Sequence, residues 1–375
     1  MFRTMPASVL LIAIGAFALG MASYVTAGLI PMIGQAFQVE VAVAAQLVTA
    51  FTLAYGIGSP LCVALLPATR QRLGLLLALA VFALTNAVSA TVTDFTLLLA
   101  CRAVAGLGAG VYLATGIAAA TTVAPADQRT KAIALIMTGM ASGTVLGVPL
   151  SLLLADWLGW QAALWLVAAL GAVAWLGLTA RLPALPTTPV QTLRSKCSLL
   201  ADARVLTLLA VSLLAAVSSL GMYTFIAPLL AEPGYGGAQN VTPYLWVWGL
   251  GGVAGSFLVG PLPERVRGPQ LTLAIMLVVA GSLLALPLAA AVSPWLAMLP
   301  IALWGAVGWA LQVPQNNQLI VVRERHGDGN LAVALNESAL QLLNVRTGAP
   351  AAWRGRPMSA CPGVRSRSRL GTACR

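Results

Sequence analysis

Long stretches without a charged residue limit what this chain can fold into more than any other feature. A helix needs about 20 consecutive apolar residues to cross a bilayer, and most of the uncharged runs have room for one such helix. The last run can hold two, and we expect the break between them near Pro287 to Pro294. We therefore predict an all-α polytopic membrane protein with ten complete helices and the start of an eleventh near Leu331. The uncharged runs are Thr4–Val39, Val41–Thr69, Leu73–Thr93, Ala103–Ala126, Ala132–Ala155, Trp157–Ala180, Val205–Ala231, Pro233–Pro263 and Gly268–Val322.

The composition excludes a soluble enzyme. Only 8% of the residues are charged and 59% are hydrophobic, whereas soluble domains carry about 25% charged residues. So much apolar surface would aggregate in water. The complete helices contain no cluster of His, Cys or carboxylates, so we expect neither a membrane enzyme nor a metal or other cofactor. The cysteines have no metal-ligand spacing, and they are Cys62, Cys101, Cys197, Cys361 and Cys374.

The loop charges predict the orientation. Apart from Arg102, every basic residue before residue 346 falls in the N-terminus or in loops on one side. The opposite loops carry only Glu40, Asp94, Asp156 and Glu232. By the positive-inside rule the N-terminus is cytoplasmic, and we expect a multi-pass protein of the bacterial inner membrane. Much of the net charge of +11 lies in an Arg-rich C-terminal tail, and ordinary inside loops explain the remainder, so nucleic-acid binding is not expected.

A basic, proline-containing loop from Pro183 to Arg204 divides the chain. Two six-helix halves joined in this way are a layout of secondary transporters. We expect the second bundle to be incomplete, with four complete helices and part of a fifth. The predicted parts are a first bundle at 1–182, a cytoplasmic linker at 183–204, a second bundle at 205–344 and a basic tail at 345–375.

The fourth and fifth predicted helices carry the main motifs. Arg102 lies about two turns inside the membrane, where a charge costs at least about 2.5 kcal/mol, so it should face a cavity or a polar partner. Gly106 and Gly110 share its helix face and allow a close approach by a helix or a substrate. The next helix has glycines at four-residue spacing, which form a groove for helix packing, and a proline that can bend it. These residues are Gly139, Gly143, Gly147 and Pro149.

Together these motifs resemble the major facilitator superfamily, specifically its twelve-span drug:proton antiporter branch and arabinose-efflux-type permeases. The first helix resembles the opening signature of the family, from Phe17 to Pro31. Arg102 with its two glycines matches the conserved-arginine motif, and the fifth helix resembles the antiporter motif. The resemblance covers about residues 8–344. The loop after the eighth helix resembles the second-half copy of the family's cytoplasmic loop motif at Gly260, Leu262, Glu264 and Arg265.

The resemblance implies alternating access, with a small organic substrate exported in exchange for protons by a monomer in the lipid bilayer. It implies roles in transport or coupling for the conserved-arginine motif, which is Arg102, Gly106 and Gly110. The same roles are implied for Tyr24 and Tyr112. Cytoplasmic gating loops are expected at Arg70, Arg72, Glu264 and Arg265. The candidate cavity residues, each of which packing would explain equally well, are Tyr223, Phe225, Gln312, Gln315, Asn316 and Asn317.

Two departures from the family pattern bear on mechanism. Pro67 stands where the family usually has an aspartate after the second helix, so we expect a gating ion pair from that position to be lost. No Asp or Glu lies well inside any complete helix, so the obvious proton-carrying carboxylate is missing. A facilitator or uptake permease of the same fold is therefore an alternative.

After Asn344 the composition changes to Arg, Gly and Pro without Asp, Glu or Lys. This change favours a frameshift near that codon, and a natural basic tail is the alternative. We expect the product to be poorly folded or inactive if the second bundle is left incomplete. A non-transporting remnant or a membrane sensor is accordingly the third interpretation.

Overall fold

The computed structural model is all-helical in the residues it describes, which are 5–185, 198–235, 241–262, 266–324 and 328–348. Eight helices in these ranges are long and apolar enough to cross a membrane. Two more predicted helices are present but do not belong to the eight. One, Thr242–Leu258, has only 17 residues. The other consists of two segments, Met298–Ala310 and Gln312–Arg323, that meet at Leu311.

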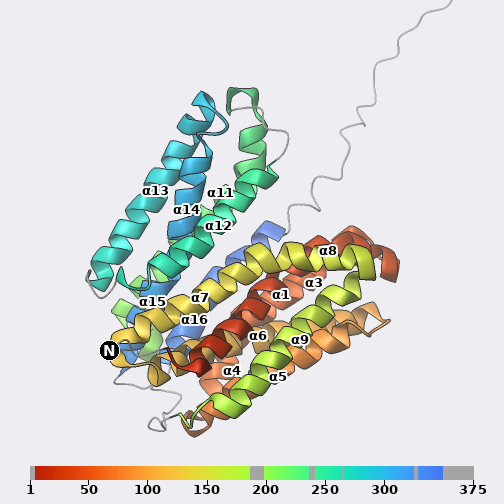
Figure 1. The fold of residues 1–375 in the computed structure, drawn as a ribbon, viewed down its shortest axis with the longest axis vertical. Coiled ribbons are helices and arrows are strands. Elements are labelled where there is room, and N and C mark those ends of the chain that lie inside the picture. Colours follow the sequence, from red (N-terminus) through yellow and green to blue (C-terminus); the bar gives the residue numbers. More distant parts are fainter. Residues whose placement is uncertain (1–4, 186–197, 236–240, 263–265, 325–327, 349–375) are drawn as a thin grey trace, which may run out of the picture.

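Six of these eight candidate spans belong to the first half of the chain, whose helices are labelled in Figure 1. Asp94 begins the fourth by accepting a hydrogen bond from the backbone N–H of Leu97 at 2.8 Å, as expected of a helix cap. Gly159, at φ +85°, separates the last two spans. The elements are α1 (Ala7–Phe37); α2, α3, the π-turn η1 and α4 (Val41–Ala44, Gln46–Leu53, Ala54–Gly58, Ser59–Leu65); η2 (Ala68–Arg70); α5 (Gln71–Ser89); α6 (Phe95–Val123); η3 (Ala126–Gln128); α7, the π-turn η4 and α8 (Arg129–Ser142, Gly143–Gly147, Val148–Leu158); and α9 (Trp160–Arg181).

The second half contains four spans and a fifth long helix. The break expected near Pro287 to Pro294 lies at the far end of that interval, because α13 continues through Pro287 to Val292 and the chain turns at residues 293–297. A proline inside a helix removes one backbone hydrogen bond, which a membrane helix tolerates. The elements are η5 (Ser198–Ala201), α11 (Ala203–Ala231), η6 (Pro233–Tyr235), α12 (Thr242–Leu258), α13 (Gly268–Val292), α14 (Met298–Ala310), α15 (Gln312–Arg323) and α16 (Gly329–Gly348).

Both π-turns precede a proline. Gly58 ends η1 two residues before Pro60, and Gly147 ends η4 two residues before Pro149. Proline lacks the N–H that would continue the α-helical ladder, and a π-turn is one way in which a helix accommodates such a gap. The second and fifth spans therefore share a local irregularity at a similar position.

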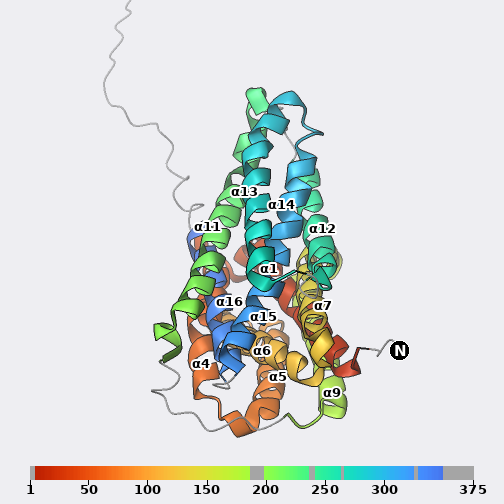
Figure 2. The ribbon, with the colours of Figure 1, turned by 90° about the vertical axis from the view of Figure 1, so that its left-hand side faces the viewer.

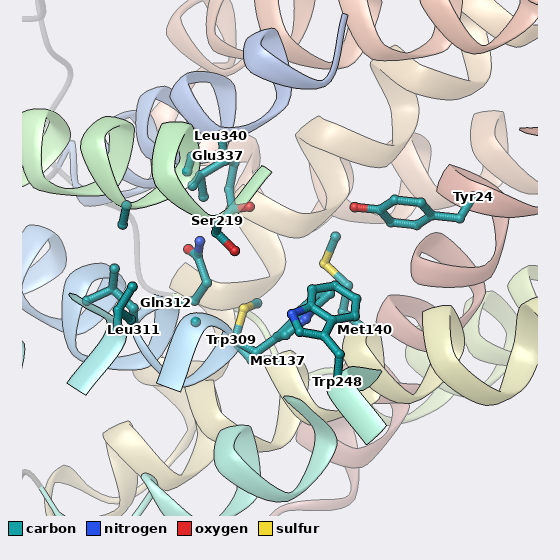
Figure 3. Close-up of a pocket in the computed structure, with 14 residues that line it drawn as sticks. Tyr24, Met137, Met140, Ser219, Trp248, Trp309, Leu311, Gln312, Glu337 and Leu340 are labelled. Atoms are coloured by element: carbon teal, nitrogen blue, oxygen red, sulfur yellow. The ribbon is translucent and has the colours of Figure 1, made fainter. Parts of the chain in front are cut away.

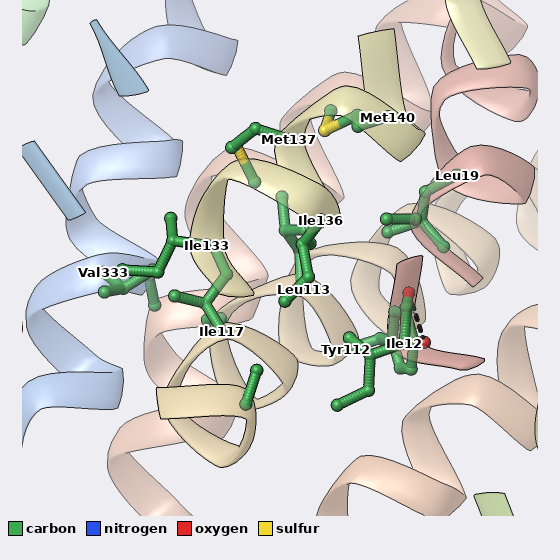
Figure 4. Close-up of a cluster of buried hydrophobic side chains, with 14 of the residues drawn as sticks. Ile12, Leu19, Tyr112, Leu113, Ile117, Ile133, Ile136, Met137, Met140 and Val333 are labelled. Carbon is green, nitrogen blue, oxygen red and sulfur yellow. Dashed lines mark hydrogen bonds between the residues drawn. The ribbon is translucent and has the colours of Figure 1, made fainter. Parts of the chain in front are cut away.

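The two bundles are joined at one end and diverge at the other (Figures 1 and 2). We call the joined end the basic side, because the loops after α4, α6 and α12 emerge there with their Arg and Lys residues. Near this side, α16 packs on α3, η1, α4 and α6, and α12 packs on α7. Val333 of α16 lies with Ile117 and Ile133 in a shared core (Figure 4). Towards the opposite loops, each bundle has a separate apolar core.

Candidate functional site

A central pocket with a cavity volume of about 130 Å³ lies where the bundles meet. Eight helices from both halves contribute to its wall: α1, α7, α11, α12, α13, α14, α15 and α16. The side chains drawn in Figure 3 include Tyr24, Met137, Met140, Ser219, Trp248, Trp309, Gln312 and Glu337.

A polar network of α15 and α16 forms one part of the wall. Asn316 donates a hydrogen bond from Nδ2 to Oε1 of Glu337 at 3.1 Å. Asn336 donates to Oδ1 of Asn316 at 2.9 Å and to Oε1 of Gln312 at 3.4 Å. Glu337 is only 4% exposed. Burying a carboxylate is costly unless it is paired or protonated, so Glu337 is the chemically distinctive group of this pocket.

Aromatic rings form another part of the wall. The ring of Trp248 lies 5.0 Å from that of Tyr223, 5.6 Å from that of Trp304 and 6.2 Å from that of Trp309, measured between centroids. Trp304 is buried and donates from Nε1 to Oγ of Ser219 at 2.8 Å. Tilted aromatic contacts at such distances stabilise the arrangement, and of these rings Trp248 and Trp309 line the second-bundle side of the pocket.

Arg102 does not line the central pocket. It is buried, and its Nη2 donates to the backbone carbonyl of Ala22 at 3.0 Å, while Nη1 reaches Oδ1 of Asn86 at 3.4 Å. Its guanidinium lies 4.5 Å from the ring centre of Phe51. It thereby connects four helices of the first bundle. Its nearest described partners are a backbone carbonyl, a side-chain amide and an aromatic ring, and none of them is a carboxylate.

The glycines and the tyrosine of the same helix also make packing contacts. A side chain at Gly106 would meet the carbonyl oxygen of Phe51, and one at Gly110 would meet Oγ of Ser59 at 2.7 Å. Tyr112 is buried and donates to the carbonyl oxygen of Ile12 at 3.0 Å, as Figure 4 shows. The close approach at these positions is therefore made by neighbouring helices.

The glycines of the fifth span lie against α1. A Cβ at Gly139 would meet the carbonyl oxygen of Ala13, and one at Gly143 would meet that of Phe17. At Gly147 it would lie 2.9 Å from Sδ of Met21. Two turns of α1 backbone thus pass directly over the glycine face, which leaves no room for side chains there. Pro149 lies at the start of α8, after the π-turn.

The loop residues have different surroundings. Arg72 donates from Nε to the carbonyl oxygen of Leu182 at 3.1 Å and from Nη2 to that of Thr179 at 3.0 Å, and so caps the end of α9. Arg70 ends the short 3₁₀ turn η2 that follows Pro67. Glu264 and Arg265 lie outside the described residues.

An ion pair connects the bundles on the basic side. Nη1 of Arg129, at the start of α7, lies 3.0 Å from Oε1 of Glu324, just after α15. Both side chains are partly exposed, so the pair contributes at most about 1 kcal/mol. It joins α7 of the first bundle to the end of α15 in the second.

The remaining candidate residues differ in whether they reach the central pocket. Gln312 lines the pocket, and Tyr223 reaches it through its contact with Trp248. Phe225 is 65% exposed and does not line it. Gln315 is fully buried, and its amide has no hydrogen-bond partner among the described residues.

Glu337 is a pocket residue that the sequence pattern did not predict. The expectation that carboxylates are missing applied to complete helices, and the eleventh helix was expected to be incomplete. In the structure α16 runs from Gly329 to Gly348, which places Glu337 near its middle. The sequence did contain a signal, because Asn336 and Glu337 interrupt a segment that begins with apolar residues at Leu331.

Comparison with known proteins gives concordant matches. The sequence profile described as Major Facilitator Superfamily matches residues 12–342. A chloramphenicol resistance protein of Streptomyces lividans is 33% identical over 281 residues, which cover 74% of this chain and 72% of that protein. The inner membrane transport protein YdhP of Escherichia coli O157:H7 is 29% identical over 336 residues, covering 89% and 85%.

A probable sugar efflux transporter of Helicobacter pylori strain P12 is 27% identical over 303 residues, covering 79% of this chain and 75% of that protein. Among solved structures, the proton:xylose symporter XylE bound to 6-bromo-6-deoxy-D-glucose matches with a TM-score of 0.72. The match covers 93% of this chain and 88% of that one at 14% identity, so it supports the fold alone.

Proposed function

Because this chain belongs to the major facilitator superfamily, we propose that it is a secondary active transporter that exports small organic molecules in exchange for protons. The observation that carries the proposal is the buried carboxylate of Glu337 in the wall of a pocket between two helix bundles. Ionisable groups inside a membrane protein typically mark a substrate or proton pathway. The names of two relatives, a resistance protein and a sugar efflux transporter, support export.

Glu337 would supply the coupling as follows. From the more acidic side of the membrane the carboxylate takes up a proton, and the neutral pocket can then turn towards the other side. Substrate binding from the cytoplasm follows proton release there. One charge that moves through 100 mV yields about 2.3 kcal/mol, which sustains roughly a fiftyfold substrate gradient.

Alternating access would use the two bundles as moving units, with the proposed boundaries 1–182 and 205–344. The structure joins them on the basic side through Arg129 and Glu324 and through the packing of α16 on the first bundle. We propose that this arrangement is closed towards the cytoplasm. The chain would work as a monomer in the bacterial inner membrane.

We expect export to depend on the proton gradient. Cells that express the chain, in a host without its own drug pumps, should retain less of at least one of three compounds than control cells: chloramphenicol, L-arabinose or ethidium. A protonophore should raise the retained amount to the control level. Export that persists unchanged with the protonophore would contradict the antiport mechanism and favour a facilitator.

The proposed orientation gives a second expectation. A cysteine that replaces Asp156, in a loop opposite the basic side, should react with an impermeant thiol reagent in whole cells. A cysteine that replaces Arg181, at the end of α9, should react only after the cells are opened. Both variants are made after the native cysteines have been replaced by serine. The reverse labelling pattern would overturn the orientation.

A further inference from the structure

A second cavity lies between the two bundles on the basic side, outside the central pocket. Its volume is about 390 Å³, compared with about 130 Å³ for the central pocket. Its wall comes from the segment before α1, the first turns of α7, the end of α12 and the loop that follows α12. The residues that line it include Met5, Lys131, Leu135, Phe257, Gly260 and Pro261.

This cavity lies where the helices leave the membrane. α1 begins at Ala7, α7 begins at Arg129 and α12 ends at Leu258, so three helix boundaries surround it. Basic residues of inside loops mark the headgroup level of the cytoplasmic leaflet. Phe257 and Leu258 in its wall are each 64% exposed. A lipid can therefore reach the cavity from the bilayer without entering the central pocket.

The wall combines one positive charge with apolar surface. Among the described residues that line the cavity, Lys131 alone has a charged side chain, and the other side chains are aliphatic, aromatic or thioether groups. An ammonium has three N–H donors, so Lys131 can bind a phosphate oxygen and keep its contact within the protein. Basic pockets between membrane helices on the cytoplasmic side suit anionic lipid headgroups. The apolar part of the wall suits an acyl chain.

Both bundles contribute to this cavity. α12 packs on α7 near the basic side (Figures 1 and 2). A Cβ at Gly260 would lie 3.0 Å from Cβ of Ala134 and 3.8 Å from Cα of Lys131, so the loop after α12 rests directly on the first turns of α7. A ligand that needs walls from both bundles stabilises the arrangement in which the bundles are joined.

We infer that this cavity binds an anionic phospholipid of the cytoplasmic leaflet, and that the bound lipid holds the two bundles together on the basic side. The phosphate of the lipid contacts Lys131, and an acyl chain lies against Leu135 and Phe257. A zwitterionic phospholipid is held less well, because its own cationic group offsets the attraction to Lys131. The inference uses the proposed orientation but not proton antiport, so each can fail without the other.

Titration of the purified full-length protein with lipid in detergent, followed by native mass spectrometry, tests this site. Phosphatidylglycerol should bind about fivefold more tightly than phosphatidylcholine with the same acyl chains, as expected for one lysine. Lys131→Gln should lose this preference, whereas Lys131→Arg should keep it because the charge remains. Glycerol phosphate, which has no acyl chains, should not compete with phosphatidylglycerol. Competition by glycerol phosphate would indicate a site for free phosphate and overturn the inference.

Arg181→Gln is the matched control. It removes one positive charge from the same side of the protein, at an exposed position at the end of α9 that does not line the cavity. It should leave the phosphatidylglycerol affinity unchanged. Phe257→Ala should weaken this affinity, whereas Leu284→Ala, at an exposed position of α13 outside the cavity, should not.

Thermal unfolding tests whether the lipid holds the bundles together. Phosphatidylglycerol should raise the unfolding midpoint of the native protein more than that of Lys131→Gln, because a ligand of the folded state stabilises it in proportion to its affinity. Without added lipid the two midpoints should agree, which separates lost binding from lost folding. Equal phosphatidylglycerol affinity in Lys131→Gln and the native protein, an equal loss in Arg181→Gln, or equal binding of the two lipids would overturn the inference.

Discussion

Glu337→Gln is expected to lower uphill export by about tenfold or more, because an amide cannot take up and release the coupling proton. The amide oxygen can still accept the hydrogen bond from Asn316, so the local structure should survive. Initial rates of uphill chloramphenicol export in everted membrane vesicles measure the effect.

Glu40→Gln is the matched control for this prediction. It makes the same chemical change in an exposed residue of the loop between the first two spans. Its export rate should equal that of the native protein. If Glu337→Gln and Glu40→Gln both export at the native rate against a gradient, the carboxylate of α16 does not couple transport to protons.

Gly143→Ala should have the second large effect. The added methyl group would collide with the backbone carbonyl of Phe17 in α1, and a backbone atom cannot move aside as a flexible side chain can. Overpacking of this kind typically costs about 1–3 kcal/mol. We expect a lower midpoint of thermal unfolding in detergent and a matching loss of transport, because α1 and α7 can no longer pack closely.

The chain provides a control for that substitution as well. Gly281 lies within α13, and a side chain there would meet nothing within 4 Å. Gly281→Ala should be neutral or slightly stabilising, since alanine has a higher helix propensity than glycine by about 1 kcal/mol. Equal unfolding midpoints for the two variants would show that the approach of α1 to Gly143 does not limit stability.

The helices were predictable from the sequence because the bilayer imposes a simple requirement on length and charge. The uncharged run from Gly268 to Val322 correctly indicated two helices. It also placed their break near Pro287 to Pro294, and the turn lies at the far end of that interval, because a proline within a membrane helix is tolerated and Pro287 does not end α13. The turn depends instead on residues 293–297, whose role the run length could not show.

The site was less predictable than the fold, because motifs give residue types but not the direction of side chains. Arg102 was expected to face a cavity or a polar partner, and Tyr112 to take part in transport or coupling; the structure places both in polar contacts between helices of the first bundle. Tyr24 and Gln312 do line the pocket. Glu337 acquires its position only from the contact of α16 with both bundles, which no local pattern specifies.

The most direct test of proton antiport is proton movement driven by substrate. Liposomes that contain the purified full chain and a trapped pH-sensitive dye are prepared with chloramphenicol or ethidium on the outside only. With the native protein, inward movement of at least one substrate should raise the internal pH, because protons leave in exchange. With Glu337→Gln the internal pH should stay constant. Substrate uptake by the native protein without any change in internal pH would contradict proton antiport.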